Sequence, residues 1–300
     1  MSSDSSFSPE SLADLCPDFE TAKQVAYDHL PEEVADAWIR MCRPAVSLSP
    51  AEQGEPVVAR FGGIPRMPEE ISWPEWEGHG PLSFVAEVDL SALTEHGLRT
   101  GLDLPEQGRL LFFYYVNPED PDALVFYEDH ESLSGARVLY VTETAADSPR
   151  RVLTDESVTA YPEVKMTGTM LSTFPEVENS RLYQEFADQE SDGESWLDLA
   201  NDDDFREALA ELEPETDHRI GGWPLSLQGP VELEAAASVL DASLYDSPEY
   251  EGEARSWRLL LQVSSSDEMI WGDSGMLYWF LREGSTGKPL PTSTFTWQCL

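Results

Sequence analysis

The residues best suited to bind a ligand lie in one short segment near the C-terminus. Asp267, Trp271 and Asp273 stand between two stretches that have the apolar pattern of β-strands. Carboxylates beside an indole ring can hold a small molecule, and a loop between two strands is a common place for binding residues. The sequence Asp273-Ser274-Gly275 is equally typical of a turn. The segment is therefore both a candidate binding site and a candidate turn.

Patterns typical of catalysis or metal binding are not found elsewhere in the sequence. The five histidines have neither the H-x-x-H nor the H-E-x-x-H spacing of metal-binding helices. The three cysteines form no C-x-x-C pair, and there is no G-x-S-x-G motif. We predict no catalytic residues, no metal site and no cofactor, and the sequence favours a function other than catalysis. These histidines and cysteines are His29, His79, His96, His130, His218, Cys16, Cys42 and Cys299.

The chain contains a repeated pattern, and the ligand-binding candidates lie in its second copy. Gly62-Gly63-Ile64-Pro65 returns as Gly221-Gly222-Trp223-Pro224, and each turn follows an arginine and an apolar residue. Three elements in the same order indicate a duplication, and such self-similarity is informative about the fold. After each turn come an alternating apolar strand and then a glycine-led aromatic strand, at 82–90 and 108–113 in the first half and at 257–263 and 275–280 in the second.

The duplication suggests where a ligand would bind. Clefts between related halves of a protein are common binding sites. Three tryptophans and two carboxylates of the second repeat could line such a cleft, and a small molecule or a substrate would then lie between the repeats. The candidate ligand-binding residues are Asp267, Trp271, Asp273, Trp223 and Trp279.

The charge of the chain limits its partners. The 300 residues include 58 acidic and 18 basic ones, which gives a formal net charge of −40. Direct binding to the phosphates of a nucleic acid is excluded on electrostatic grounds. An acidic surface speeds encounter with a basic protein, whereas acidity as a background property of the genome or of a saline cytoplasm would only aid solubility. Both interpretations stay open.

The sequence also gives expectations about location. No apolar run approaches the roughly 18 residues that a membrane-spanning helix needs, and the N-terminus lacks the basic start and apolar core of a signal peptide. An odd number of cysteines without a framework spacing favours a reducing compartment. We therefore expect a cytoplasmic protein without a membrane association.

The chain divides into segments of different composition. Several strands joined by short turns favour an α+β fold with a mixed or mostly antiparallel sheet. Besides the repeated elements, the sequence predicts strands at 123–127 and 136–141 and a closing hairpin of 276–282 and 293–298. A Ser- and Asp-rich start precedes two amphipathic helical patterns, and a densely acidic stretch separates the repeats. We predict a disordered N-terminus at 1–17, a helical pair at 18–43, a linker at 44–54, and one domain at 55–300 that comprises repeat one at 55–184, an acidic insertion at 185–217 and repeat two at 218–300.

The motifs of both halves resemble the YwqG-like family, also called DUF1963, a bacterial family without an assigned activity. The resemblance covers about 60–300 and implies two related sheet-bearing repeats in one globular body. It implies no catalytic residues, and Glu87 stands where the family more often has Gln. The matching segments are FGGIPRMPEEISWP, PLSFVAEVDL, GRLLFFY, HRIGGWPLSLQG, LLLQVSSSD, WGDSGMLYWFL and FTWQCL.

Two functional hypotheses follow. The first is an acidic protein-binding module, similar to an immunity protein or an antitoxin or acting as an accessory protein, whose partner is a basic protein. The second is a small-molecule-binding protein or an enzyme with its site between the repeats. The sequence does not determine the oligomeric state.

Overall fold

One antiparallel sheet dominates the computed structural model, which describes residues 7–117, 123–142, 148–152, 158–245, 247–284, 290 and 292–300. Ten strands pair in the order β14-β13-β12-β11-β1-β8-β2-β5-β6-β7, and each neighbouring pair is antiparallel. The strands are β1 (Arg43–Pro50), β2 (Ala59–Phe61), β5 (Ser83–Asp89), β6 (Arg109–Tyr114), β7 (Ala136–Val141), β8 (Val164–Thr173), β11 (Arg219–Gly221), β12 (Trp257–Ser264), β13 (Met276–Arg282) and β14 (Ser293–Gln298).

Short helices and two small hairpins complete the fold. Among the described residues, no helix is both long and apolar enough to cross a membrane. The hairpins are β3 (Glu75–Trp76) with β4 (Gly80–Pro81) and β9 (Glu190–Ser191) with β10 (Glu194–Ser195). The helices are α1 (Pro9–Leu15), α2 (Phe19–His29), α3 (Glu32–Ile39), α4 (Leu90–Glu95), α5 (Ser180–Phe186), α6 (Trp196–Ala200), α7 (Asp203–Ala210), α8 (Val231–Ala237) and α9 (Pro248–Ala254), with 3-10 turns η1 (Ser132–Gly135) and η2 (Ala242–Leu244).

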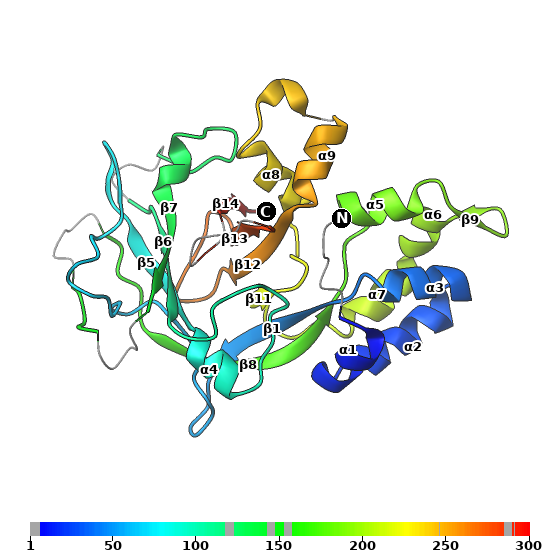
Figure 1. The fold of residues 1–300 in the computed structure, drawn as a ribbon, viewed down its shortest axis with the longest axis horizontal. Helices are drawn as coiled ribbons and strands as arrows, with labels where there is room; N and C mark the ends of the chain where they lie inside the picture. Colours follow the sequence, from blue (N-terminus) through cyan, green and yellow to red (C-terminus); the bar gives the residue numbers. More distant parts are fainter. Residues whose placement is uncertain are drawn as a thin grey trace.

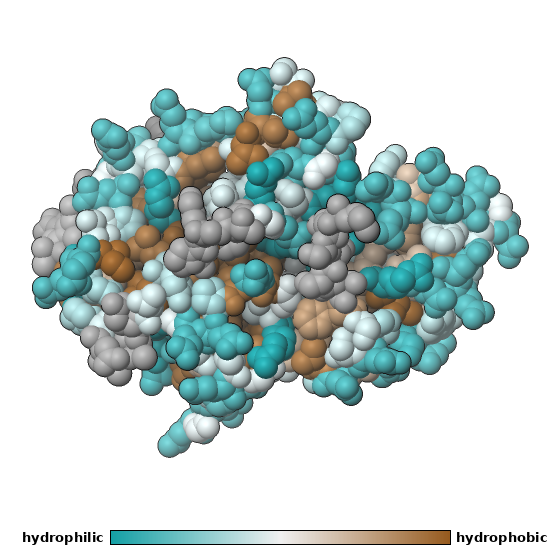
Figure 2. Space-filling view, in the orientation of Figure 1, coloured by the Kyte–Doolittle hydropathy of each residue, from teal (hydrophilic) through white to brown (hydrophobic). Residues whose placement is uncertain are grey.

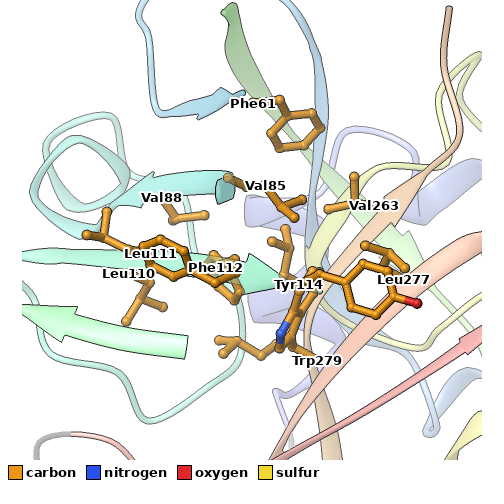
Figure 3. Close-up of a cluster of buried hydrophobic side chains, with 14 of the residues drawn as sticks. Phe61, Val85, Val88, Leu110, Leu111, Phe112, Tyr114, Val263, Leu277 and Trp279 are labelled. Carbon is orange, nitrogen blue, oxygen red and sulfur yellow. The ribbon is translucent and has the colours of Figure 1, made fainter. Parts of the chain in front are cut away.

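The sheet curls so that its two ends face each other (Figure 1). Between them lies the central core, the cluster of buried apolar side chains that includes Val46, Phe112 and Leu277. The ring of Phe112 on β6 lies 5.2 Å from that of Trp279 on β13, centroid to centroid, and Tyr114 lies 5.1 Å from Phe295 on β14. Figure 3 shows Phe112 and Tyr114 converging with Leu277 and Trp279. Alternate residues of each strand share a face, so the apolar pattern of both ends fills one interior.

Helix α8 covers the outer face at the second end of the sheet, and α9 packs on α8. Val231 and Ala235 of α8 pack against Trp257, Leu259 and Tyr278, which point away from the central core. These side chains are almost completely buried, so β12 and β13 have apolar residues on both faces. A strand enclosed on both sides has a nearly continuous apolar sequence, as these do.

The segment expected to be a linker is instead the central strand β1. It pairs with β8 on one side and with β11 on the other. Val46 and Leu48 are completely buried in the central core, while Ser47 and Ser49 alternate with them. This alternation is the pattern of a strand, and the prolines at its ends, Pro44 and Pro50, concealed it in the sequence.

The N-terminal region and the acidic insertion form one helical lobe, seen beside the sheet in Figure 1. Three helices, α1 to α3, stand where a disordered start and a helical pair were expected, and Leu12 of α1 is buried. Residues 1–6 lie outside the described residues. The insertion contributes the last two residues of α5 and the whole of α6 and α7. Phe186 of α5 and Phe205 of α7 pack with Trp38 of α3 in one cluster. The acidic side chains lie mostly on the outside, since charged groups resist burial.

The fold is α+β, as the sequence predicted, and its sheet is wholly antiparallel. Strand β7 has the predicted bounds, whereas 123–127, expected to be a strand, has no regular structure. Strands β2, β5, β6 and β7 stand on one side of the β1–β8 pair, and β11, β12, β13 and β14 stand on the other in the corresponding order. The Gly62-Gly63 and Gly221-Gly222 turns follow β2 and β11, with φ between 61° and 75° at all four glycines.

Candidate functional site

Three charged side chains form a row across the outer face of the sheet. In the register, Arg60 of β2 is paired with Lys165 of β8 on one side and with Glu87 of β5 on the other. Directly paired residues of antiparallel strands point to the same face. The next residue, Phe61, belongs to the central core on the opposite face. The alternation that buries Phe61 therefore places Arg60 and its two neighbours outside the core.

The Gly62-Gly63 turn brings the chain back over this row. Both glycines have positive φ, 61° and 75°, a region that other residues rarely adopt. A Cβ atom on Gly62 would lie 2.2 Å from the carbonyl oxygen of Pro162, so a side chain cannot be accommodated without movement of the backbone. Gly63 donates its N–H to the carbonyl of Tyr161 at 2.8 Å. The turn is therefore fixed by both conformation and packing.

Beyond the turn, two arginines are brought together by pairing of distant segments. Arg66 and Arg150 form an isolated antiparallel bridge. Next to it, the N–H of Met67 donates to the carbonyl of Pro149 at 3.1 Å. Backbone bonds rather than side-chain attraction thus place these two like charges near each other.

A buried ion-pair network forms the floor. Glu87 accepts hydrogen bonds from Arg60 at 2.9 Å and from Arg109 at 2.7 Å, one on each carboxylate oxygen. Arg109 also donates to the carbonyl of Arg66 at 2.7 Å and to Oγ of Ser148 at 2.8 Å. The side chains of Arg109 and Glu87 are 1% and 5% exposed. Charge-assisted bonds of this kind are strong, and they fix both guanidinium groups in position.

These elements enclose the first-half pocket, a cavity of about 200 Å³. Four of the chain's 18 basic residues and two of its 58 acidic residues line it. One of the two acids, Glu87, is already paired with two guanidinium groups, so the lining is net cationic. The lining residues are Arg60, Gly62, Ile64, Arg66, Phe84, Glu87, Arg150, Glu163 and Lys165.

The exposed cations of this pocket are only weakly neutralised. Arg150 lies 3.8 Å from Glu163, and both side chains are partly exposed. Lys165 is exposed and makes no ion pair with any residue that the structure describes. The face of the molecule in Figure 2 is covered largely by hydrophilic residues, as a net charge of −40 leads one to expect. A cationic pocket on such a protein is a local reversal of its charge.

The arrangement can bind an oxyanion. A guanidinium group presents two parallel N–H donors that match a carboxylate or a phosphate, and an ammonium group adds a compact charge. Phe84 and Ile64 supply an apolar wall beside these donors. Arg60 and Lys165 come from strands β2 and β8, and Arg66 and Arg150 from two segments joined by a backbone bridge. Arg60 is held in place by its hydrogen bond to Glu87 before a ligand arrives.

Comparison with known proteins gives a family. A family model described as a domain of unknown function, DUF1963, matches residues 59–299. The chain belongs to the DUF1963 family. No curated protein matches it.

The DUF1963 match covers the first-half pocket but not the whole sheet. Every residue that lines this pocket, from Arg60 to Lys165, lies within the match. The match begins at β2 and so leaves out α1 to α3 and the central strand β1. The resemblance to DUF1963 noted in the sequence, over about 60–300, is confirmed in its family and in its extent.

The predicted ligand-binding residues are not gathered around one cavity. Trp271 and Trp279 are 2% and 1% exposed and belong to the central core. Asp267 and Asp273 are exposed, and Asp273 lies in a turn. The backbone carbonyl of Asp273 accepts a hydrogen bond from the N–H of Leu300 at 3.0 Å. Asp273 thus has the place of a turn residue, the alternative that the sequence left open.

Trp223 lies apart from the other four, close to the helical lobe. Its indole N–H donates to the carbonyl of Met41 at 2.8 Å, and the guanidinium of Arg43 stacks on its ring at 3.2 Å. None of the five predicted residues lines the first-half pocket. The space between the two ends of the sheet is filled by the central core, because the inner faces of both ends are apolar.

The sequence contained a signal for this pocket that was not used. Arg60 and Arg66 flank the Gly62-Gly63 turn in a chain where only 18 of 300 residues are basic. Two cations so close to a Gly-Gly turn could have indicated an anion site. Arg150 and Lys165 could not be found this way, since only the folded sheet brings them to the turn.

Proposed function

We propose that the protein binds a small oxyanion, a phosphate ester or a carboxylate, in the first-half pocket. The observation that supports this most is the cationic lining at Arg60, Arg66, Arg150 and Lys165 on a protein with a net charge of −40. Lys165 makes no ion pair with a described residue, and Arg150 has only a partly exposed one, at 3.8 Å from Glu163. A bound anion would supply the missing countercharge.

The size of the pocket suits a charged group rather than a large molecule. Its volume of about 200 Å³ holds a phosphate or carboxylate group with a short apolar extension. Such an extension would lie against Phe84 and Ile64, and the charged end against Arg60 and Lys165. Most small-molecule sites combine an apolar wall with a few fixed polar groups in this manner.

Titration calorimetry with inorganic phosphate, at constant ionic strength, tests the proposal. We expect binding that Lys165→Ala weakens at least about tenfold, since a charge-assisted hydrogen bond contributes roughly 1.5–3 kcal/mol. Arg206→Ala is the matched control, because Arg206 is exposed on α7 and does not line the first-half pocket. If phosphate, sulfate and succinate all fail to bind, or if Lys165→Ala binds them as the wild type does, the proposal is wrong.

The acidic surface supports a second candidate, recognition of a basic protein in the cytoplasm by an immunity-like or accessory module. The net charge of −40 and the mostly exposed acidic residues of the helical lobe favour it. Capture from the native lysate at low and then at raised salt would test it. Stoichiometric release of one basic protein by salt is the expected result, and binding that salt does not weaken would contradict it.

The three free cysteines are compatible with a reducing compartment.

We also infer that the two sides of the sheet arose by duplication. The corresponding strand order on either side of the β1–β8 pair supports this, as do the two Gly-Gly turns with similar φ. In this interpretation the first-half pocket belongs to one repeat, rather than to a cleft between the two.

A further inference from the structure

Two side chains of opposite charge stand close together along the chain and face the first-half pocket. Lys165 of β8 is paired in register with Arg60, and Glu163 comes two residues earlier, just before the strand begins. Val164, the residue between them, packs against the central core. Because successive side chains of an extended chain alternate, Lys165 and Glu163 point to the opposite, outer face. Both of them line the pocket.

The Gly62-Gly63 turn leaves room for the carboxyl group of Glu163. A Cβ atom on Gly63 would lie 2.8 Å from Cβ of Glu163 and 3.0 Å from its Oε2. The ion pair of Glu163 with Arg150 measures 3.8 Å, which is longer than a hydrogen bond. In the part of the chain that the structure describes, no donor makes a hydrogen bond to this carboxylate. Glu163 is therefore held beside the turn with its hydrogen-bonding capacity unused.

The ammonium group of Lys165 is unused in the same way. It is exposed, and it makes neither an ion pair nor a hydrogen bond with any described residue, Glu163 included. The two residues lie about 6.6 Å apart along the chain, since a strand rises about 3.3 Å per residue. A cation and an anion that are kept apart in one pocket are complementary to a ligand that carries both charges itself.

We propose that the first-half pocket binds a small zwitterion, a molecule with an oxyanion and an ammonium group a few bonds apart, such as an amino acid. The oxyanion contacts Lys165 and Arg60, and the ammonium group donates to Glu163. The carbon atoms between the two charges lie against Ile64 and Phe84, and the cavity of about 200 Å³ admits an amino acid with a small side chain. This inference rests on the anion binding proposed above and adds an amine to the ligand.

Glu163 gives the pocket a means of discrimination. An anion without an amine meets the negative charge of Glu163 and gains nothing from it, whereas a zwitterion turns the same carboxylate into a hydrogen-bond acceptor. Specificity commonly combines an attraction for one ligand with a repulsion of its competitor. The amine should therefore improve binding only while Glu163 is charged.

Calorimetry with propionate, alanine and β-alanine at constant pH and ionic strength tests the proposal. All three ligands share the carboxylate and the carbon count, and only the last two carry an amine, on C2 and C3 respectively. We expect at least one amine to bind about fivefold or more tightly than propionate, since the new ion pair is hydrogen-bonded but partly exposed. In Glu163→Gln this preference should disappear while propionate still binds. Glu207→Gln is the matched control, because Glu207 is exposed on α7 and does not line the pocket.

Inorganic phosphate, titrated into the same proteins, separates this inference from anion binding itself. Phosphate has no amine, so Glu163→Gln should bind it at least as tightly as the wild type does. If the wild type binds phosphate and propionate but neither amine more tightly than propionate, the pocket is a simple anion site and the zwitterion proposal is wrong. It is equally wrong if Glu163→Gln keeps the preference for the amine or loses propionate as well. If no anion binds at all, both proposals fail.

Discussion

The two halves of the sheet differ most at one equivalent position, Glu87 in β5 and Gln262 in β12. Each is paired in register with an arginine, Glu87 with Arg60 and Gln262 with Arg219. Glu87 is held by two guanidinium groups at the floor of a pocket. Gln262 is completely buried, accepts a hydrogen bond from the N–H of Leu225 at 3.0 Å and donates to the carbonyl of Asp217 at 2.7 Å.

The difference shows that each half has the side chain that suits its outer face: a neutral amide where the chain covers that face, and a carboxylate where a cavity stays open. In the second half, the chain after the Gly-Gly turn lies over Gln262, and α8 closes the rest. In the first half, the corresponding chain stands off from the sheet and leaves a cavity above Arg60 and Glu87. A neutral amide satisfies the buried backbone groups of a closed face, whereas a carboxylate between two arginines anchors an open cationic one.

The largest effect is expected from removing the buried arginine of the first half. Arg109→Ala should lower the free energy of unfolding by about 3–5 kcal/mol, because it leaves the buried Glu87 carboxylate with only Arg60. Arg219→Ala removes an equally buried arginine from the second half, but its partner Glu213 is 41% exposed and can be solvated. We expect a smaller loss there, measured by urea unfolding of both variants. Equal losses would mean that the ion pair of Glu87 is not what distinguishes the halves.

The turns should be equally sensitive in the two halves. Gly62→Ala would place Cβ 2.2 Å from the Pro162 carbonyl oxygen, and Gly221→Ala would place it 2.2 Å from that of Thr100. We expect each to cost about 3 kcal/mol, from the positive φ and the clash together. Gly78→Ala is the control, since Gly78 has φ of 87° but open space around it, and it should cost about 1–2 kcal/mol. Chemical denaturation measures all three.

The helix that closes the second half contains a buried carboxyl. Burial, with a contribution from Glu176, raises the pKa of Glu232 to about 7, although Asn179 donates to it at 2.7 Å. Because the native state holds this proton more tightly than the unfolded chain, stability should fall as the pH rises from about 4.5 to about 7. Glu232→Gln removes this loss and should be more stable than the wild type at pH 8, by about 1–3 kcal/mol.

Thermal or urea unfolding of both proteins at pH 5 and pH 8 measures this effect. Glu176 and Glu234 titrate nearby, so the difference between wild type and variant is the quantity to follow. A difference that does not grow between the two pH values would show that Glu232 is ionised in the native protein at both.

The smallest effect is expected from Glu87→Gln, which makes the first half more similar to the second. Glu87→Gln gives β5 the residue that β12 has, and it removes one negative charge from the pocket floor. Phosphate binding should tighten about three- to tenfold, since a unit charge at close range is worth roughly 1 kcal/mol when solvent screens it as in bulk water. Calorimetry measures it, with Arg206→Ala again as the control. Weaker binding would show that Glu87 positions Arg60 more than it opposes the ligand.

Strands with long apolar patterns could be predicted from the sequence, and those with short or interrupted patterns could not. Strands β7, β13 and β14 have the predicted bounds, since their apolar residues are bordered by clear turn residues. Strand β1 was taken for a linker because prolines stand near both its ends. Helix α1 was missed because it has only seven residues and buries a single side chain, that of Leu12.

The candidate site was beyond prediction for a different reason. Its charged residues come from β2, β5, β8 and two irregular segments, and pairing across three strands is what unites them. The tryptophans chosen from the sequence proved to be core residues, Trp279 against Phe112 for example. An aromatic side chain near a carboxylate in sequence does not reveal whether the two will face the same space.

The position of β1 has a consequence for how the protein is made. Val46 pairs with Met170 on one side and with Ile220 on the other, so the middle of the sheet joins residues that are far apart in the chain. Closing such long loops is slow, because their entropy is lost before the contacts form. During synthesis, one edge of β1 therefore stays unpaired until its partner β11, residues 219–221, has left the ribosome. The high negative charge would keep these unfinished chains apart through mutual repulsion.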